Sequence, residues 1–406
     1  MKQYHKLLKN ILENGTQKLD RTGTGTLSVF VDTMRFDLSK GFPAVTTKKL
    51  AWKAVVTELL WFIEGSGDEK RLKELLHNDY YSEKNTIWSP NANAPYWKPK
   101  GLFEGDLGLI YGNMWRKWET DGKKIELVKK RELEESTNIE KDLLNKEYKL
   151  RNKIDKDILH LWKKIMKKCL KNKKLSISTD WQNFEIFQRE IKSIAGFYSW
   201  AKNKKEYDLD CYYYNTFQFG KKSSTFLPVK YVEKMSKEKQ KTESYRKVYY
   251  IDQLKNLIQE IKDNANSRRH ILTAWNPAKL EEMGLPPCHT FSQFEVSNGK
   301  LNCMLYCRSQ DVFLGTPFNI ASYSLFLHML AQVCGLEVGE YIHVGGDCHI
   351  YNNHIEGVKE QLKRKPLELP KLILNPNIKD IDDFTIEDIK LEGYQSYDKI
   401  AGTMAV

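Results

Sequence analysis

The stretch LPPCHTFSQFEVSNGKLNCMLYCRSQDVFLGTPFNIASY, residues 285–323, contains the pattern that decides the fold. Apolar and polar residues alternate over 291–296 and again over 300–308, and this period of two predicts two strands. An apolar segment at 320–334 follows and is typical of a buried helix. Strands and helices mix here without the regular rhythm of a doubly wound parallel sheet. We therefore expect an α+β fold.

Outward from this stretch, the same periodicities predict further helices and strands. Amphipathic helices are expected at 4–12 and 251–263, and a strand is expected to begin at Leu27. Residues 50–64 indicate a buried helix that carries Glu58 inside an apolar run. A buried carboxylate is costly unless it is paired or used in chemistry, so Glu58 is a candidate functional residue.

Composition excludes several classes of protein. The 406 residues are 41% hydrophobic and 29% charged, which is too apolar for a disordered chain. No apolar run approaches the roughly 18 residues of a membrane helix, and the N-terminal sequence lacks the apolar core of an export signal. Seven cysteines, an odd number without a CxxC pair, argue against a disulfide scaffold or a zinc ribbon. We expect a cytoplasmic protein in a reducing environment, with no membrane partner.

The net charge of +12 is concentrated in one internal segment. Residues 119–250 contain 32 basic and 20 acidic residues, whereas the rest of the chain contains 33 of each. Such a sharp break in composition predicts an inserted module in a neutral, enzyme-like body. The expected division is 1–118 and 251–406 for the two parts of the body and 119–250 for a mainly helical module, with charged helices from about 123 to 173.

Cys288 in LPPCHTF is the first candidate for catalysis. Pro286 and Pro287 stiffen the chain before it, so the thiol is presented from a rigid turn, and His289 follows directly. A thiol presented in this way is a candidate nucleophile. The alternative is a buried structural cysteine, which is the usual role of a cysteine outside a disulfide.

Several arginines stand close to hydroxyl or glycine residues and together suggest a site for a dianion. They are Arg21 in the DRTGTGT loop, Arg268 and Arg269 after Ser267, and Arg308 before Ser309. A guanidinium group offers a planar fork of donors that fits phosphate oxygens, and positive charge also lowers the pKa of a nearby thiol. Taken singly, each arginine is better explained as a solvated surface residue or one half of a surface ion pair.

Two other stretches carry polar residues among apolar ones. Asn319 in DVFLGTPFNIASY can donate and accept hydrogen bonds at once, which suits an imide such as uracil, although an Asn that caps a turn looks the same. GGDCHIYNNH, residues 345–354, offers Asp347, His349 and His354. These histidines lack the i, i+4 spacing of a helical zinc site, so no metal is expected.

These segments, in this order, resemble the thymidylate synthase family, most closely the versions carried by large tailed bacteriophages. The resemblance covers about 1–118 and 251–406. It rests on QKLDRTGTGTLSVF, GFPAVTTKK, ELLWFIEG, IYGNMWR, SRRHILTAWNP, LPPCH, RSQDVFLGTPFNIASY, VGGDCHIYNNH and the final MAV. It implies a homodimer with a mixed β-sheet surrounded by helices. The implied activity is the methylation of dUMP to dTMP with 5,10-methylenetetrahydrofolate, without a metal, in the cytoplasm of a host cell if the gene is viral.

The resemblance also implies a role for each matching residue. Cys288 would attack C6 of dUMP, and Glu58 would organise water and shuttle protons near the pyrimidine O4 and the folate. The other catalytic residues implied are His289, Tyr111 and Asp311. The nucleotide would be held by Arg21, Arg308, Ser309, Asn319, His349 and Tyr351, with Arg268 and Arg269 from the partner subunit. The folate would be lined or covered by Lys48, Trp88, Asp311, Gly315, Phe318 and Val406.

The sequence departs from the family pattern at two places. Cys307 stands where the family usually has a Gln that helps to frame the nucleotide site. Residues 89–101 differ from the usual tryptophan-containing stretch on the folate side. If water reached the exocyclic methylene before hydride, the product would be 5-hydroxymethyl-dUMP, which is the alternative activity. Trp88 and Leu285, which would help to exclude water, are both present, so methylation is favoured.

The basic segment has a resemblance of its own. Residues 148–232 partly match a small module found in phage genes of the homing-endonuclease type. No HNH constellation is present, so nuclease activity is not expected. Residues 119–250 could bind nucleic acid weakly through phosphate contacts and stacking, or they could be a charged insertion tolerated in a surface loop. A further alternative is an inactive scaffold that only displays this module, against which the intact Cys288, Glu58 and Asn319 argue.

Overall fold

The computed structural model describes most of the two parts of the body and some of the basic segment. The described residues are 1–20, 23–79, 82–120, 127–129, 153–171, 176–177, 187, 191, 194, 207–210, 218–219, 225–228, 244–246 and 249–403. Arg21 and Val406, both expected in the site, lie outside these residues. Within the described ranges, no helix is both long enough and apolar enough to cross a membrane.

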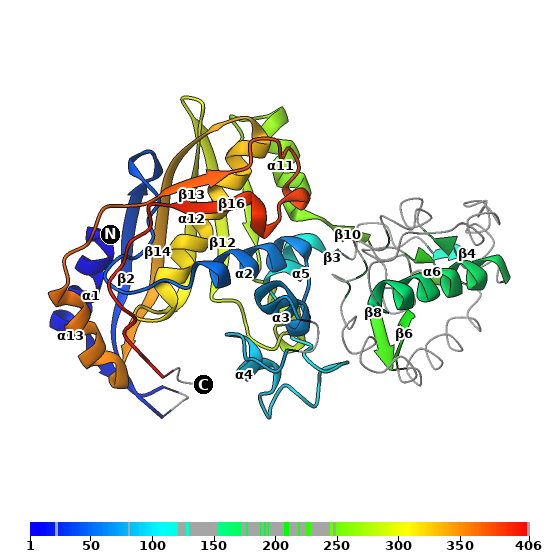
Figure 1. Ribbon diagram of the computed structural model, residues 1–406, viewed down its shortest axis with the longest axis horizontal. Helices are drawn as coiled ribbons and strands as arrows, with labels where there is room; N and C mark the ends of the chain where they lie inside the picture. Colours follow the sequence, from blue (N-terminus) through cyan, green and yellow to red (C-terminus); the bar gives the residue numbers. More distant parts are fainter. Residues whose placement is uncertain are drawn as a thin grey trace.

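A mixed six-stranded sheet forms the centre of the described structure, in the order β1-β2-β14-β13-β12-β11 (Figure 1). Its strands are β1 (Thr16–Lys18), β2 (Thr26–Asp37), β11 (Ile271–Thr273), β12 (His289–Ser297), β13 (Lys300–Asp311) and β14 (Glu337–Tyr351). β13 and β14 run parallel, and the other neighbouring strands are antiparallel. The expected combination of strands and helices is confirmed, and β12 and β13 confirm the strands predicted at 291–296 and 300–308.

Side-chain alternation explains why one face of the sheet is buried. On β13, Leu301, Cys303, Leu305 and Cys307 are buried, while the residues that alternate with them are partly exposed. A parallel partner strand cannot follow through a tight turn, and α12 (Gly315–Cys334) makes the connection from β13 to β14. Most residues of α12 are buried, which confirms the apolar helix predicted at 320–334.

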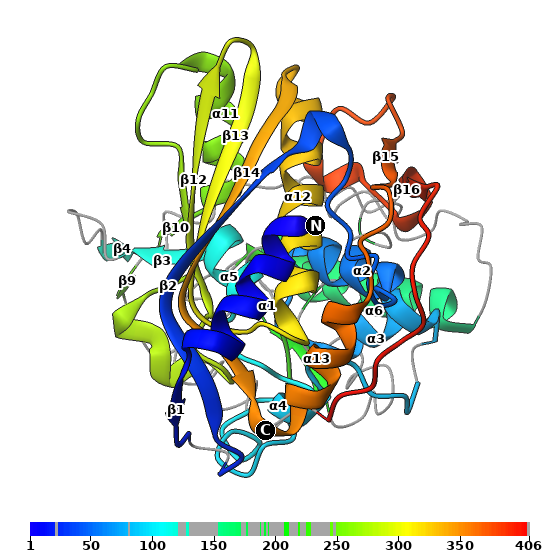
Figure 2. The same cartoon turned by 90° about the vertical axis from the view of Figure 1, so that its left-hand side faces the viewer.

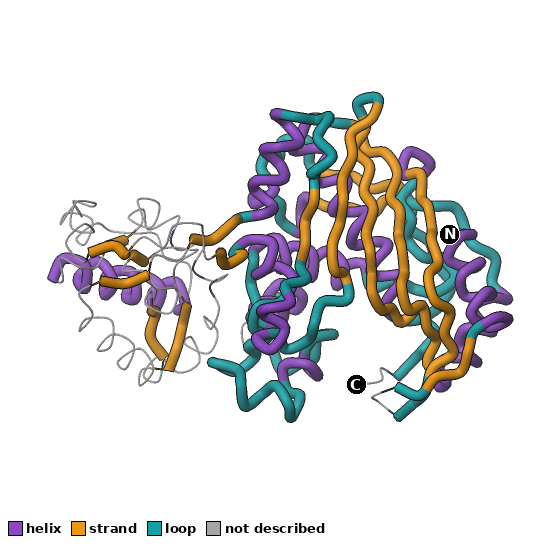
Figure 3. The backbone as a smooth tube through the Cα atoms, turned by 180° about the vertical axis from the view of Figure 1, so that it is seen from behind, coloured by secondary structure: helices purple, strands orange, loops and turns teal. Residues whose placement is uncertain are grey.

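Helices cover one face of this sheet. α1 (Lys2–Asn14), α2 (Trp52–Glu64), α12 and α13 (Ile355–Lys363) lie on the same side of the strands (Figure 2). The view from behind shows β2, β14 and β13 with no described helix in front of them (Figure 3). On β2, Phe30 is 77% exposed and Val31 is 50% exposed. Large apolar side chains that a strand leaves in solvent are typical of an interaction surface.

α2 and α5 (Tyr111–Arg116) approach each other closely at Gly112. A Cβ atom at Gly112 would lie 2.4 Å from the Phe62 carbonyl oxygen and 2.9 Å from the Phe62 Cα, so only glycine fits. α2 ends at Gly65, whose φ of 70° is favourable for glycine. The chain then continues into α3 (Glu69–His77) and the short α4 (Ser89–Ala92). This close packing fixes Glu58 on α2 relative to Tyr111 on α5.

Further elements frame the sheet. α11 (Gln253–Asp263) confirms the helix predicted at 251–263, and the Asp252 side chain caps it by accepting a hydrogen bond from the Lys255 N–H. β15 (Lys371–Leu374) and β16 (Ile389–Glu392) form an antiparallel pair. Outside 119–250, the 3₁₀ helices of the described residues are η1 (Leu38–Lys40), η6 (Pro277–Glu282), η7 (Asn352–His354), η8 (Ile381–Asp383) and η9 (Ile386–Asp388).

A short antiparallel pair, β3 (Trp118–Thr120) with β10 (Tyr249–Ile251), stands at the two ends of 119–250 (Figure 1). The other described parts of this segment lie between these two strands in the sequence. They include α6 (Lys153–Lys171), on which five apolar side chains are buried: Ile158, Leu161, Trp162, Ile165 and Met166. The paired strands are β4 (Leu127–Lys129) with β9 (Ser244–Arg246), β5 (Ser176–Ile177) with β7 (Gln218–Phe219), and β6 (Tyr207–Asp210) with β8 (Thr225–Pro228). The described part of a segment expected to be mainly helical therefore contains several short strands as well as α6.

The prediction of charged helices from about 123 to 173 is correct only in part. α6 accounts for Lys153–Lys171, whereas Leu127–Lys129 is a strand that pairs with β9. The partner strand is distant in the sequence, so a pattern of neighbouring residues could not reveal this pairing. Residues 130–152 lie outside the described residues.

Candidate active site

Cys288 lies immediately before β12, and its backbone is fixed on both sides. Its N–H donates a hydrogen bond to the Tyr111 hydroxyl oxygen at 2.8 Å. Its carbonyl accepts one from the Arg308 N–H at 2.9 Å. The side chain is partly exposed, and Pro286 and Pro287 stiffen the chain that leads to it. A fixed backbone with an accessible thiol suits a nucleophile.

The Arg308 guanidinium is held next to the Cys288 thiol. Its Nε donates to the Pro287 carbonyl at 2.9 Å, and its Nη2 donates to the Pro286 carbonyl at 2.8 Å. Nη2 also lies 3.8 Å from Cys288 Sγ, and the guanidinium lies 5.5 Å from the centre of the Trp275 ring. Positive charge beside a cysteine stabilises the thiolate, which is the nucleophilic form.

Other cysteines of the sheet are in a different environment. Burial raises the pKa values of Cys303, Cys307 and Cys348 well above the ordinary value for a thiol. These three thiols therefore stay protonated and are poor nucleophiles. Cys307, which stands where a Gln was expected, donates a hydrogen bond to the Ser309 carbonyl at 3.2 Å. A buried amide is nevertheless present nearby, because Gln310 donates to Cys348 Sγ at 3.0 Å.

Glu58 projects from α2 and is paired with Trp88. The indole Nε1 donates a hydrogen bond to Glu58 Oε1 at 2.7 Å, and Trp88 is 6% exposed. Burial raises the pKa of Glu58 from 4.5 to about 7, and the hydrogen bond from Trp88 opposes this rise. A carboxyl group with a pKa near neutrality can both donate and accept a proton, as general acid–base catalysis requires.

Tyr111 connects Glu58 with Cys288. Its ring centre lies 5.8 Å from that of Trp88, which holds Glu58, and 5.2 Å from that of His289. Its hydroxyl group contacts the backbone of Cys288, as described above. The nucleophile candidate and the acid–base candidate therefore belong to one continuous group of contacts.

His289 and Asn319 form the next part of this group. Burial lowers the pKa of His289 to about 4, and a side-chain hydrogen bond with Asn319 opposes the fall. The imidazole is therefore neutral near pH 7, with one nitrogen as donor and the other as acceptor. A neutral ring in this position orients the Asn319 amide. The His289 ring also packs edge-on against Tyr323, with 5.2 Å between centres.

Neighbouring strands β13 and β14 carry a second set of polar site residues. The strand register pairs Ser309 with Asp347. Asp347 Oδ1 contacts His349 Nδ1 at 2.9 Å, and its Oδ2 contacts Lys18 Nζ at 2.9 Å. The hydrogen bond to His349 holds the pKa of Asp347 well below its usual range. The Tyr351 ring centre lies 5.1 Å from that of His349, so both expected ribose-binding side chains occur together.

Asp311 and Lys48 meet at the start of α12. Asp311 Oδ1 accepts hydrogen bonds from the backbone N–H groups of Phe313 at 2.9 Å and Leu314 at 3.0 Å. Lys48 Nζ donates to the Phe313 carbonyl and lies 3.7 Å from the centre of its ring. Burial lowers the pKa of Lys48 to about 8, and the charge of Asp311 opposes the fall. Asp311 and Lys48, two of the residues expected on the folate side, thus both bind the backbone just before α12.

The end of the described chain lies close to the start of α12. Gly315 begins α12, and Phe318 lies partly buried in its first turn. His354, whose ring packs against Phe313 at 5.1 Å, donates from Nε2 to the Thr403 carbonyl at 2.9 Å. The residues that follow Thr403 include Val406, which is outside the described residues.

Arg268 and Arg269 occupy a different position from the other candidates. Both are exposed, on the connection between α11 and β11, and the Arg269 N–H donates to Ser267 Oγ at 3.2 Å. Arg21, the remaining arginine candidate, lies outside the described residues. Of the arginines considered, Arg308 alone is placed beside Cys288 by a described contact.

Two residues of this site had no role in the sequence-based site. Asp347 orients His349, and the alternation of β14 places both on the same face of the strand, which is a signal that the sequence does contain. Trp275 lies against Arg308, and no local pattern indicates that contact. Among the described residues, no group of three or more His, Cys, Asp or Glu side chains could hold a metal ion.

Comparison with protein families finds a match over nearly the whole chain. A family model described as thymidylate synthase matches residues 2–154 and 141–406. The matched ranges contain Cys288, Glu58 and Arg308, together with the strands and helices that position them.

The raised pKa of Glu58 predicts a pH-dependent contribution to stability. A carboxyl group that holds its proton more tightly in the folded state stabilises the fold at low pH, and this effect disappears as pH rises through the folded-state pKa. Relative to Glu58→Gln, the wild-type chain should therefore lose stability between pH 4.5 and about pH 7. Urea unfolding of both proteins across this range measures the difference.

Glu13→Gln, which removes an exposed carboxylate of α1, is the control for the loss of one charge. A difference between wild type and Glu58→Gln that stays constant with pH would contradict a raised pKa at Glu58.

Proposed function

The chain belongs to the thymidylate synthase family, and we propose that it methylates dUMP to dTMP with 5,10-methylenetetrahydrofolate as donor of the carbon and the hydride. Members of this family bind dUMP and folate and modify dUMP by one-carbon transfer. The observation that carries the proposal is the position of the Cys288 thiol, 3.8 Å from the Arg308 guanidinium. The Tyr111 hydroxyl accepts a hydrogen bond from the Cys288 N–H, and His289, which is hydrogen-bonded with Asn319, follows Cys288 in the chain.

In the proposed reaction, Cys288 is the nucleophile. Its thiolate bonds to C6 of dUMP, and the electron pair of the C5–C6 double bond moves toward C5 and O4. C5 then bonds to the methylene carbon of the folate, loses its proton, and tetrahydrofolate leaves with an exocyclic methylene formed. Hydride from tetrahydrofolate reduces this methylene while the thiolate leaves C6, giving dTMP and dihydrofolate. Covalent catalysis thus divides one difficult substitution into easier steps.

Glu58 and Asn319 have complementary roles in this proposal. Glu58, with a pKa of about 7, exchanges protons with water near O4 and C5. Asn319, oriented by neutral His289, reads the donor and acceptor edge of the uracil. The two bonds from Arg308 to proline carbonyls use only part of the guanidinium, so it can also bind the 5′-phosphate with Ser309.

The remaining candidates are assigned by their positions. His349 and Tyr351, held beside Asp347, would bind the ribose 3′-hydroxyl. Arg21 would join the phosphate contacts. The folate would lie against Lys48, Trp88, Asp311, Gly315, Phe318 and Val406.

The choice between methyl and hydroxymethyl products depends on the exclusion of water. Trp88 is 6% exposed and is held against Glu58, and Leu285 is partly buried. These apolar groups favour hydride over water at the exocyclic methylene. Methylation is therefore the proposed outcome, and 5-hydroxymethyl-dUMP is the alternative product.

The covalent intermediate of this reaction can be trapped and its mass can be measured. Incubation with 5-fluoro-dUMP and methylenetetrahydrofolate should give a stable ternary adduct on Cys288, detected by intact-protein mass spectrometry. Cys288→Ala should abolish the adduct, whereas Cys334→Ala, at another partly exposed cysteine, should retain it. With dUMP itself, the product mass should be that of the methyl compound.

A hydroxymethyl product would replace the first assignment by the alternative. The absence of any adduct would favour an inactive scaffold.

The exposed apolar residues of β2 support a homodimer. β2 carries Phe30 and Val31 in exposed positions, and apolar side chains of this size favour burial against a second copy. We propose that the Arg268 and Arg269 side chains, exposed within one chain, complete the phosphate site of the partner.

Shared sites predict complementation between two inactive variants. Cys288→Ala lacks the nucleophile, and Arg268→Ala/Arg269→Ala lacks the arginines offered to the partner. After co-refolding, half of the dimers would be mixed and each would contain one complete site, so about a quarter of wild-type activity should return. Sedimentation of each variant confirms that dimers form. Activity no higher than that of the separate variants would show that each chain uses its own arginines.

We also propose that residues 119–250 bind nucleic acid weakly. On α6, apolar side chains are buried while Lys164 and Lys167 are exposed, and the segment carries the entire net positive charge. Fluorescence anisotropy of the full chain with duplex and single-stranded DNA should show binding at low salt. Binding should weaken by orders of magnitude as salt rises, as expected for phosphate contacts. No binding at low salt would leave a charged insertion as the explanation.

A further inference from the structure

Glu69, the first residue of α3, is a buried carboxylate that the proposed reaction does not use. It is 2% exposed, and it follows Asp68, which caps the helix by accepting a hydrogen bond from the Lys70 N–H at 2.9 Å. A buried charge is costly unless it is paired and hydrogen-bonded. Oε2 of Glu69 forms an ion pair with Lys73 at 3.4 Å, and Oε1 accepts two hydroxyl donors from residues 86–89.

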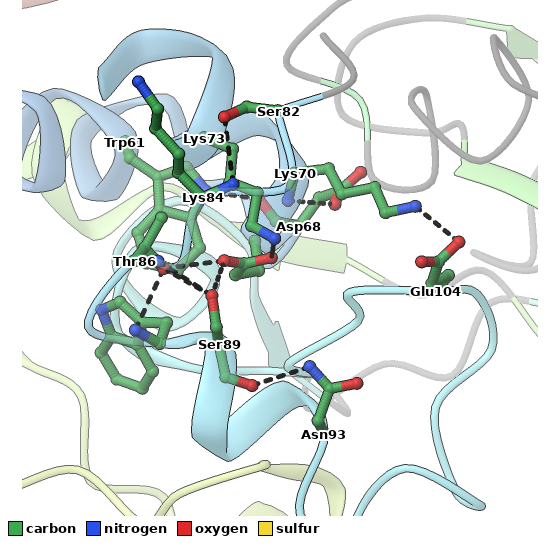
Figure 4. Close-up of polar contacts among 12 residues, drawn as sticks. Trp61, Asp68, Lys70, Lys73, Ser82, Lys84, Thr86, Ser89, Asn93 and Glu104 are labelled. Carbon is green, nitrogen blue, oxygen red and sulfur yellow. Dashed lines mark hydrogen bonds and ion pairs between the residues drawn. The ribbon is translucent and has the colours of Figure 1, made fainter. Parts of the chain in front are cut away.

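The two hydroxyl groups belong to Thr86 and Ser89 (Figure 4), and they fix the backbone around Trp88. Thr86 Oγ1 donates to Glu69 Oε1 at 2.8 Å and accepts from the Trp88 N–H at 3.1 Å. Ser89 Oγ donates to the same Oε1 at 2.5 Å and accepts from the Thr86 N–H at 2.9 Å. Thr86 and Ser89 are both buried. The segment therefore cannot shift without breaking buried hydrogen bonds, which is costly.

The side chain of Trp88, whose backbone is held in this way, contacts Glu58 directly. Its Nε1 donates to Glu58 Oε1 at 2.7 Å. Its ring centre lies 5.8 Å from those of Trp61 and Tyr111, so the indole is enclosed by other rings. A continuous series of contacts thus joins one buried carboxylate, Glu69, to the proposed acid–base group.

We propose that Glu69 is a positioning residue, which holds the Trp88 indole against Glu58 through Thr86 and Ser89. It thereby favours the ionised form of Glu58 and keeps water away from the reacting methylene. The second effect rests on the proposed function, whereas the first concerns only contacts within the described chain.

The direction of the effect follows from the hydrogen bond of Trp88. This bond opposes the raised pKa of Glu58, so a displaced indole should raise that pKa further. Tyr323 of α12 also interacts with Glu58, and Asp68, Lys73 and His77 surround Glu69. Because these groups also titrate or carry charge, the titration of Glu58 has to be isolated by comparison with Glu58→Gln in each variant.

The experiment measures this titration without using activity. Three proteins are studied: wild type, Glu69→Ala and Thr86→Val/Ser89→Ala. The free energy of unfolding of each is measured across a pH series and compared with that of the same protein carrying Glu58→Gln in addition. This pH dependence gives the midpoint of the Glu58 titration, which should rise by about half a pH unit to one pH unit in both variants. Glu69→Gln, which keeps an oxygen acceptor, should restore most of the wild-type midpoint. Glu74→Gln, which removes a carboxylate of α3 ion-paired with Arg71, should not move it.

Product analysis gives a second readout. The hydroxymethyl share of the product should increase about twofold or more in Glu69→Ala and in Thr86→Val/Ser89→Ala, and should not change in Glu74→Gln. The ternary adduct on Cys288 should still form in all three, because Glu69 does not contact the reacting atoms.

Unmoved midpoints in Glu69→Ala and in the double variant would overturn the inference. If Glu69→Ala does not fold, the double variant decides, because it leaves Glu69 paired with Lys73. A wild-type chain that makes neither product would count against the proposed function, while the midpoint of the Glu58 titration would still decide the role of Glu69.

Discussion

The hydrogen-bonded register of β12, β13 and β14 is the constraint on which the site depends. It places Ser309 opposite Asp347, and the Arg308 N–H bonds to the Cys288 carbonyl where β13 passes the turn before β12. Side chains alternate along a strand, so a slip of one residue would exchange the two faces of β13 and remove Arg308 from the thiol. Burial of Leu305 and its neighbours against the helices opposes such a slip. The core therefore determines where the chemistry can occur.

Enclosure by that core shifts the pKa values of three ionisable groups of the site in the same sense. Burial moves each of three side chains toward its neutral form, because it raises the pKa of Glu58 to about 7 and lowers those of His289 to about 4 and Lys48 to about 8. Hydrogen bonds then orient these side chains, and Arg308 supplies permanent positive charge at the thiol. A water-poor site with fixed dipoles stabilises developing charge better than water does.

Sequence periodicity predicted features that depend on neighbouring residues. It placed β12, β13 and α11 correctly, and it placed α12 with a start five residues too late, because its first turn contains Gly315, Thr316 and Pro317 rather than an apolar run. It also marked Glu58 as a carboxylate within a buried helix. The contact of Glu58 with Trp88 and that of β4 with β9 join residues far apart in the chain, and these follow from tertiary packing that no local pattern encodes. The roles of the remaining site residues came from family resemblance and stay proposals.

The β3–β10 pair brings together two points that are far apart in the sequence. Because Glu119 and Tyr250 are partners in an antiparallel ladder, the chain leaves the body and re-enters it at neighbouring points. The separation of those two points does not depend on the length of sequence between them, and loop closure becomes only slowly more costly as that length grows. The ladder thus ties both ends of the intervening sequence together, so that sequence can change in length while the spacing of the two paired strands stays the same.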